Sequence, residues 1–173
     1  SLLTLLAATA AGLAPSAHAA WPDKPIRVVV PFAGGGMGTV FGNMVTDVLQ
    51  ARLGVSAIVD HKPGANAALG TEHAAKSAPD GYTLLMVTTG SMAINPAFYP
   101  KLRYDPLRDF TPVGMIWMSR NVLFADPAKA KSLKQLIELG RTRSLTYGSL
   151  GVGSLAHLSS EQLIRAERIE AVH

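Results

Sequence analysis

The chain has 173 residues, of which 48% are hydrophobic and 16% charged, and its formal net charge at pH 7 is +4. This length suits about one domain, and the absence of cysteine excludes disulfides, thiol nucleophiles and cysteine metal ligands. Aromatic residues make up only 6%, and the basic residues are dispersed apart from a solvated patch over 129–143, so no nucleic-acid partner is expected.

Residues 1–20 contain no Asp, Glu, Lys or Arg and open with an apolar run. The run is shorter than the roughly 20 residues needed to span a membrane. Ala17-His18-Ala19 matches the small-x-small pattern of a signal peptidase site, and a buried helix is the alternative. We expect residues 1–20 to be the remnant of a signal peptide. The remainder is then exported to the periplasm as a free protein, since no cysteine is present to carry a lipid.

The next part of the chain predicts a parallel sheet. The run at 26–30, which is β-branched apart from Arg27, is typical of a strand buried on both faces. Apolar residues recur at helical spacing from Val40 to Leu53, between a candidate N-cap at Thr39 and a stop at Gly54. We expect strands over 26–30, 55–59 and 83–88 and helices over 40–53 and 71–77. This is a βαβαβ succession with right-handed crossovers.

Beyond residue 95 the pattern is looser. Three prolines lie between Asn95 and Asp109, so this stretch is expected to be irregular with at most short helices. The remaining elements are expected as strands over 112–118, 121–124, 145–147 and 169–172, and as helices over 132–140 and 154–166. The whole pattern predicts a fold of the α/β class.

The glycine-rich loop from Phe32 to Thr39 is the most informative segment for function. It follows the first predicted strand, contains three consecutive glycines and opens a helix. Helix N-termini carry unpaired N–H groups and a partial positive charge, and glycine lets a ligand approach bare backbone. The loop therefore predicts a site for a small anion such as a carboxylate, since neither Gly-x-Gly-x-x-Gly nor a Walker A pattern is present. A tight connection whose glycines only permit close packing is the alternative.

The segment from Thr88 to Asn95 follows the third predicted strand. Ligands of open α/β sheets bind beyond the carboxyl ends of the strands, where this segment offers hydroxyl and amide groups. Ordinary turn hydrogen bonds are the alternative explanation for them. Further along, Ser154 and His157 lie on the first turn of a predicted helix, where Ser154 either caps the helix or donates to a ligand.

A second glycine pattern suggests a different class of protein. Gly151-Val-Gly-Ser-Leu-Ala156 fits Gly-x-Gly-x-x-Gly/Ala, and Glu170 lies nineteen residues after Gly151. A dinucleotide-dependent oxidoreductase is therefore the alternative, although the preceding strand is short and polar. The histidines lack metal-ligand spacing, and no serine lies in a nucleophile elbow. We expect no catalytic residue, no metal and no cofactor, so the protein is not expected to be an enzyme.

Seven short motifs follow one another along the chain after residue 20. They are Trp21-Pro-Asp-Lys-Pro, Val30-Pro-Phe-Ala-Gly-Gly-Gly, Pro79-Asp-Gly-Tyr-Thr-Leu, Ala93-Ile-Asn-Pro, Tyr104-Asp-Pro, Asp109-Phe-Thr-Pro and Leu145-Thr-Tyr-Gly-Ser. Together they resemble the Bug family, the periplasmic solute receptors of tripartite tricarboxylate transporters. The resemblance implies a type II periplasmic-binding-protein-like fold, with two lobes built on parallel-rich sheets. Such a protein closes on a small carboxylated solute and delivers it to a membrane permease.

The resemblance also assigns lobes and candidate ligand-binding residues. Residues 21–121 correspond to the first lobe, and residues 122–173 to the crossover and the first part of a second lobe that is incomplete in this chain. The first loop departs from the family's usual Pro-Gly-Gly-Gly-Thr-Asp at Gly34, Met37 and Thr39. A truncated receptor without activity is a further alternative. The candidate ligand-binding residues are Phe32, Ala33, Gly35, Gly36, Thr39, Thr88, Gly90, Ser91 and Asn95 in the first lobe, and Ser149, Gly153, Ser154 and His157 in the second.

Overall fold

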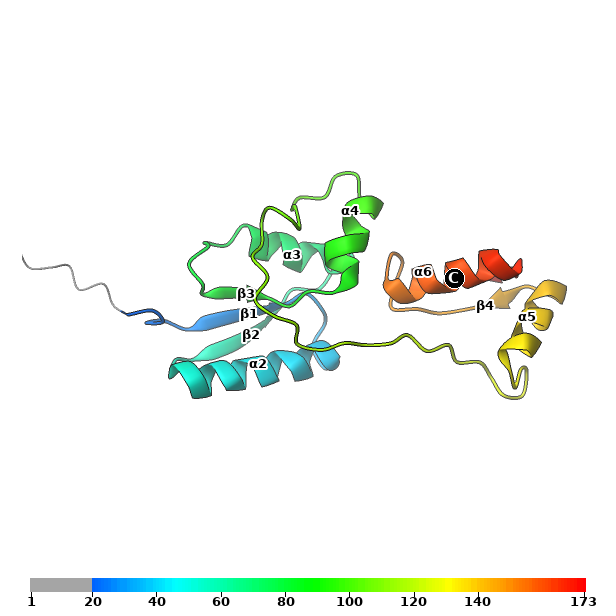
Figure 1. Cartoon of the computed structure of the whole chain (residues 1–173), viewed down its shortest axis with the longest axis horizontal. Coiled ribbons are helices and arrows are strands. Elements are labelled where there is room, and N and C mark those ends of the chain that lie inside the picture. Colours follow the sequence, from blue (N-terminus) through cyan, green and yellow to red (C-terminus); the bar gives the residue numbers. More distant parts are fainter. Residues whose placement is uncertain (1–19) are drawn as a thin grey trace, which may run out of the picture.

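The computed structural model describes residues 20–173 (Figure 1), so almost all of the segment interpreted as a signal peptide lies outside the described residues. The chain forms two α/β units, each built on its own parallel sheet. A long extended strap, residues 111–125, leads from the first unit to the second. Among residues 20–173, none of the helices combines the length and the apolarity that a membrane span requires.

The first sheet has the order β2-β1-β3, and both pairings are parallel. β1 is Ile26–Val30, β2 is Ala57–His61 and β3 is Thr83–Leu85. Because β1 is central, it is buried on both faces, as its β-branched sequence predicts. Val28, Val29 and Val30 are each at most 1% exposed. The predicted strand over 26–30 is confirmed, and β2 lies two residues later than the predicted strand over 55–59.

Helices cover both faces of this sheet. α2 (Met37–Leu53) packs on β1 and β2, and α3 (Ala68–Ala75) packs on β1 and β3 from the other side (Figure 1). α2 begins three residues before the predicted helix over 40–53, because Gly36 is its N-cap. The predicted cap at Thr39 is wrong, since its hydroxyl lies inside the helix and accepts from the N–H of Gly35. The predicted stop at Gly54 is confirmed by its left-handed backbone.

β3 ends at Leu85, earlier than the strand predicted over 83–88, and the chain then turns helical instead of forming an open loop. A π-helix, η2 (Gly90–Ile94), continues into α4 (Asn95–Phe98). The physical reason is local. Thr88 and Ser91 exchange side-chain to backbone hydrogen bonds that close a helical turn after the strand.

The strands predicted over 112–118 and 121–124 are wrong. In the described part of the chain, residues 111–125 form neither strand nor helix. An apolar extended run becomes a strand only where a neighbouring backbone completes its hydrogen bonds, and β1 is the only strand that pairs with β3 among residues 20–173. The strap is held instead by Trp117, which packs against the core. Much of its remaining apolar surface is exposed, as at Val113 (88%) and Phe124 (87%).

The second unit contains α5 (Leu133–Thr142), β4 (Leu145–Thr146), α6 (Leu155–Glu167) and β5 (Ala171–Val172). Ser132 caps α5 and Ser154 caps α6, each accepting from the backbone N–H three residues on. β4 and β5 pair in parallel and are shorter than predicted. A sheet of two short strands is consistent with a lobe that is incomplete in this chain.

Candidate functional site

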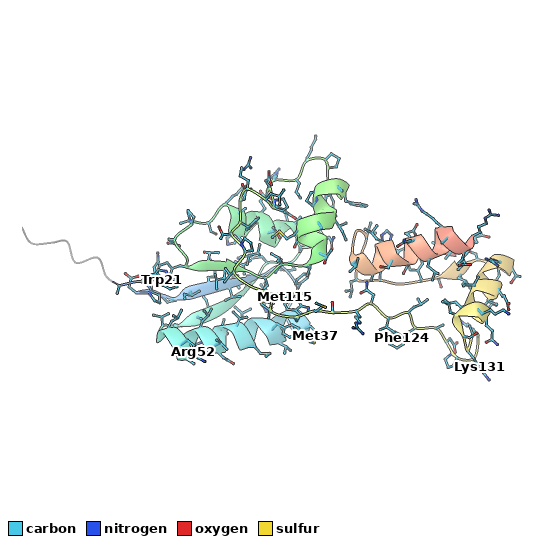
Figure 2. The ribbon with its side chains drawn as sticks, viewed as in Figure 1. Trp21, Met37, Arg52, Met115, Phe124 and Lys131 are labelled. Atoms are coloured by element: carbon cyan, nitrogen blue, oxygen red, sulfur yellow. The ribbon has the colours of Figure 1, made fainter. Side chains whose placement is uncertain are left out.

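The candidate site lies where the first unit faces the second. The carboxyl ends of β1, β2 and β3 point toward the second unit (Figure 1). Met37, at the start of α2, lies at that same end, and Arg52 lies at the far end of the helix (Figure 2). The loop after β1 is therefore at the edge of the sheet where open α/β folds bind ligands.

The glycine loop, residues 32–38, is held in shape by hydrogen bonds to Thr39 and His61. The N–H of Gly35, which has φ of 90°, donates to Thr39 Oγ1 at 2.9 Å. His61 Nδ1 lies 2.9 Å from the carbonyl oxygen of Phe32, which can only accept, so this nitrogen carries the proton. Nε2 is then free to accept from the Thr39 hydroxyl at 3.3 Å. The C-terminal residue of β2 thus fixes the shape of the loop after β1.

Three backbone donors remain available at the start of α2. Within residues 20–173, the N–H groups of Gly36, Met37 and Gly38 have no hydrogen-bond acceptor. Gly36 and Met37 are exposed, and a Cβ added to Gly36 would meet no atom within 4 Å. Unpaired N–H groups at the positive end of a 17-residue helix can hold an anion.

The segment after β3 is held mainly by bonds within the protein. Ser91 is fully buried and donates its hydroxyl hydrogen to the carbonyl oxygen of Thr88 at 3.1 Å. Asn95 is also fully buried, and its amide donates to the carbonyl oxygen of Asn66 at 2.9 Å and to Tyr104 Oη at 3.2 Å. Gly90 is buried, and a Cβ there would lie 3.3 Å from Asn66 Nδ2. The side chains of Ser91 and Asn95 therefore set the backbone of this segment and present no polar surface to solvent.

Asn66 was not singled out from the sequence, yet it joins the two units. Its Nδ2 donates to Asn95 Oδ1 at 3.0 Å and to the carbonyl oxygen of Gly153 at 3.1 Å. Ala65, Asn66 and Ala67 all have positive φ, at 48°, 49° and 69°. The left-handed conformation costs about 1–2 kcal/mol per residue with a Cβ. The sequence signal was Pro63-Gly64-Ala-Asn, since asparagine tolerates this conformation better than most residues.

The candidates of the second unit lie in and after the loop that precedes α6. Ser149 Oγ lies 2.8 Å from His173 Nε2 and also accepts from the N–H of Gly151. Ser154 Oγ accepts from the N–H of His157, and the N–H of Gly153 donates to His157 Nδ1 at 3.4 Å. These residues form one local cluster. No hydrogen bond joins it to the glycine loop within residues 20–173, and its link to the first unit runs through Gly153 and Asn66.

Tyr147 closes this cluster on the side of α6. Burial, together with its hydrogen bond to Glu161 at 2.6 Å, raises the pKa of Tyr147 to about 12. The ring of His173 lies 4.9 Å from that of Tyr147 and 4.6 Å from that of His157. In the described range 20–173, no three His, Asp or Glu side chains gather in a way that could hold a metal ion.

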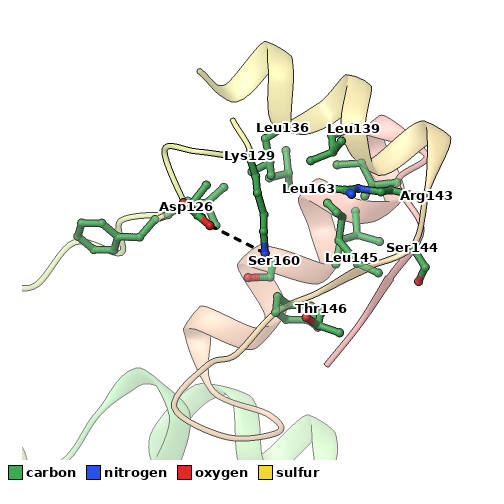
Figure 3. A pocket seen from close by; sticks show the side chains of 17 residues that line it. Asp126, Lys129, Leu136, Leu139, Arg143, Ser144, Leu145, Thr146, Ser160 and Leu163 are labelled. Carbon is green, nitrogen blue, oxygen red and sulfur yellow. Dashed lines mark ion pairs between the residues drawn. The ribbon is translucent and has the colours of Figure 1, made fainter. Parts of the chain in front are cut away.

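A cavity of about 500 Å³ lies elsewhere in the second unit, between the strap, α5, β4 and α6 (Figure 3). Lys129 and Asp126 form an ion pair of 3.9 Å beside it, and leucines from both helices make much of its wall. None of the candidate ligand-binding residues lines it. We interpret it as unfilled core of the second unit.

Comparisons with known proteins agree with this architecture. Residues 42–173 match the family described as Tripartite tricarboxylate transporter family receptor. BugT of Bordetella pertussis is 34% identical over 165 residues, which cover 93% of this chain and 51% of BugT. A solved R. palustris protein with adipate is 30% identical with a TM-score of 0.74, and covers 88% of this chain and 52% of its own. MatC from Rhodopseudomonas palustris with bound malate is 26% identical with a TM-score of 0.68, and the match covers 88% of this chain and 53% of MatC.

This chain therefore spans about half the length of the relatives that it matches. The family is described as one of receptors, and the solved relatives include the periplasmic binding protein BugD. None of these descriptions is that of an enzyme.

Proposed function

Because the chain belongs to the tripartite tricarboxylate transporter receptor family, we propose that it binds a small carboxylated solute between its two α/β units. In this proposal the solute passes to the permease subunits of a tripartite tricarboxylate transporter. The protein acts in the periplasm, to which residues 1–20 direct it. Residues 21–121 serve as the first lobe, and residues 122–173 as the crossover and the first part of the second.

The observation that carries the proposal is the group of unpaired N–H donors of Gly36, Met37 and Gly38. A hydrogen bond to a charged acceptor is worth about 1.5–3 kcal/mol, so two or three such bonds would hold a carboxylate without a basic side chain. The hydrogen bonds of Thr39 with Gly35 and His61 keep these donors in place before the solute binds. Such preorganisation reduces the entropy lost on binding.

We assign the far end of the solute to the second unit. The start of α6, with Ser154 and His157, supplies the second group of polar atoms. Relatives of this chain have been solved with adipate and with malate, which carry a carboxylate at each end. A short dicarboxylate would place one carboxylate at α2 and the other near α6. Around it we place Phe32, Ala33, Gly35, Gly36, Thr39, Thr88 and Gly90 from the first unit, and Ser149, Gly153, Ser154 and His157 from the second. Ser91 and Asn95, which are fully buried, belong to this site as the residues that hold the backbone after β3 in shape.

Thermal unfolding of the chain with a panel of solutes tests the proposal. Adipate and malate should raise the melting temperature, because a ligand at 100 times its Kd stabilises the native state by about 2.7 kcal/mol. Adipamide, which has the same length without charge, is the matched control and should leave the melting temperature unchanged. The proposal fails if no dicarboxylate, tricarboxylate or aromatic acid in the panel raises the melting temperature above the adipamide control.

A further inference from the structure

The contact between Asn66 and Gly153 is a direct hydrogen bond between the two units. The two residues are 87 positions apart in the chain, and the bond is 3.1 Å long. Gly153 is in contact with the first unit, since a Cβ on it would lie 3.4 Å from Asn66 Nδ2 and 3.7 Å from the ring of Phe98, both ordinary van der Waals distances. Its φ of 80° is the reason for glycine at this position.

The first unit holds Asn66 rigidly in the conformation that this bond requires. Asn66 and Asn95 exchange hydrogen bonds in both directions, and Asn95 is fully buried and also bonded to Tyr104. An asparagine amide has two donor hydrogens, and here one is directed to Asn95 and the other to Gly153. The left-handed backbone of three consecutive residues costs energy that a merely connecting loop would avoid.

We propose that Asn66 is an interlobe latch: a positioning residue that holds the Gly153 loop, and with it the start of α6, against the first unit. The inference rests on the proposed function, and it adds the group that sets how closed the protein is before a solute binds. The apparent Kd for a solute equals the intrinsic Kd divided by the fraction of closed molecules. Loss of the latch therefore weakens solute binding even though Asn66 itself need not touch the solute.

Asn66→Gly separates the latch from the backbone strain. Glycine accepts positive φ without steric strain, and this relief offsets part of the stability that the variant loses with the two side-chain hydrogen bonds. Ala65→Gly is the matched control, because it relieves the same kind of strain one residue earlier and removes no hydrogen-bonding side chain. We expect Asn66→Gly to raise the Kd for adipate or malate about tenfold, measured by titration calorimetry, and Ala65→Gly to leave it within twofold.

The position of the two units provides a readout that needs no solute. The chain has no native cysteine, so donor and acceptor dyes can be attached at Ala51→Cys on α2 and Gln162→Cys on α6, both exposed. Energy transfer should fall in Asn66→Gly relative to Ala65→Gly. Asn66→Asp is the second variant. It retains the shape of the side chain but replaces the donor Nδ2 by a carboxylate oxygen, which cannot donate to Asn95 Oδ1 or to the carbonyl oxygen of Gly153, so energy transfer should fall in the same way.

The outcomes separate the two proposals. If the parent binds no carboxylate but energy transfer still falls in both Asn66 variants, the latch stands and the proposed function fails. If solutes bind but the Asn66 variants match Ala65→Gly in Kd and in energy transfer, the latch is overturned and the receptor function remains.

Discussion

Phe41 and Trp117 stack face to face, with ring centroids 4.4 Å apart and ring planes 6° from parallel. Phe41 lies on α2 and Trp117 on the strap, so the pair fastens the connection between the units to the first unit. The stack holds this part of the strap, which forms no strand, against α2.

Trp117→Ala should therefore loosen the strap and lower the free energy of unfolding by about 2 kcal/mol, from lost stacking and lost burial. Urea unfolding measures the free energy, and limited proteolysis should show faster cleavage within residues 111–125. Val113→Ala is the control, because Val113 lies in the same segment but is 88% exposed. Equal unfolding midpoints for the two variants would contradict a structural role for the stack.

Met37→Pro should weaken solute binding about tenfold without unfolding the helix. Proline removes the N–H of Met37, but it is well tolerated at the first position of a helix. Gly36 already has the extended backbone, φ −95° and ψ −172°, that precedes proline comfortably. Met37→Ala retains the N–H and removes the same side chain, so calorimetry on the two variants isolates one backbone donor. Identical affinities would show that this donor does not contact the solute.

Gly70→Ala should lower the free energy of unfolding by about 1–3 kcal/mol, the usual cost of overpacking. A Cβ on Gly70 would lie 2.6 Å from the carbonyl oxygen of Lys62, which follows β2, and 2.7 Å from Pro31 Cβ, which follows β1. Gly114→Ala is the comparison, because a Cβ there meets no atom within 4 Å. Thermal unfolding followed by circular dichroism should show a lower melting temperature for Gly70→Ala alone.

Tyr147 should be the last tyrosine to ionise in an alkaline titration. Burial and the Glu161 carboxylate raise its pKa from 10.0 to about 12, so between these values the folded protein binds a proton that the unfolded chain has lost. The stability that protonated Tyr147 contributes is complete below pH 10 and disappears as the pH rises toward 12. Absorbance at 295 nm, a wavelength at which tyrosinate absorbs, should lose its last step in Tyr147→Phe. In Glu161→Gln that step should move toward pH 10, and an unchanged last step would contradict the assignment.

The first sheet could be predicted from the sequence because its information is local. The run at 26–30 is apolar apart from Arg27, and the helical spacing after it predicts the start of α2 to within three residues. The strap was mispredicted because its apolar residues, such as Val113 and Met115, look like strand residues, while strand formation depends on a neighbour that local patterns do not specify. The exact start of a helix is also hard to predict, as α2 shows. Its N-cap is Gly36, and glycine has no side chain that would mark the position as a cap.

The candidate site divides in the same way. The glycine loop was evident from composition, and its exposed donors agree with an anion site. Asn66 was missed because its importance lies in two partners that are 29 and 87 residues away. Local sequence patterns do not reveal contacts between residues so far apart in the chain. The burial of Ser91 and Asn95 was equally invisible, since polar residues in a loop normally face water.

The order of the strands along the chain has a consequence for biosynthesis. Within the described residues 20–173, the three strands of the first sheet, β2, β1 and β3, all lie before residue 86, so they are synthesised before any part of the second unit. The β4–β5 pair instead waits for residues 171 and 172. Nascent chains should therefore acquire protease resistance in two steps, early for the amino-terminal sheet and late for the other.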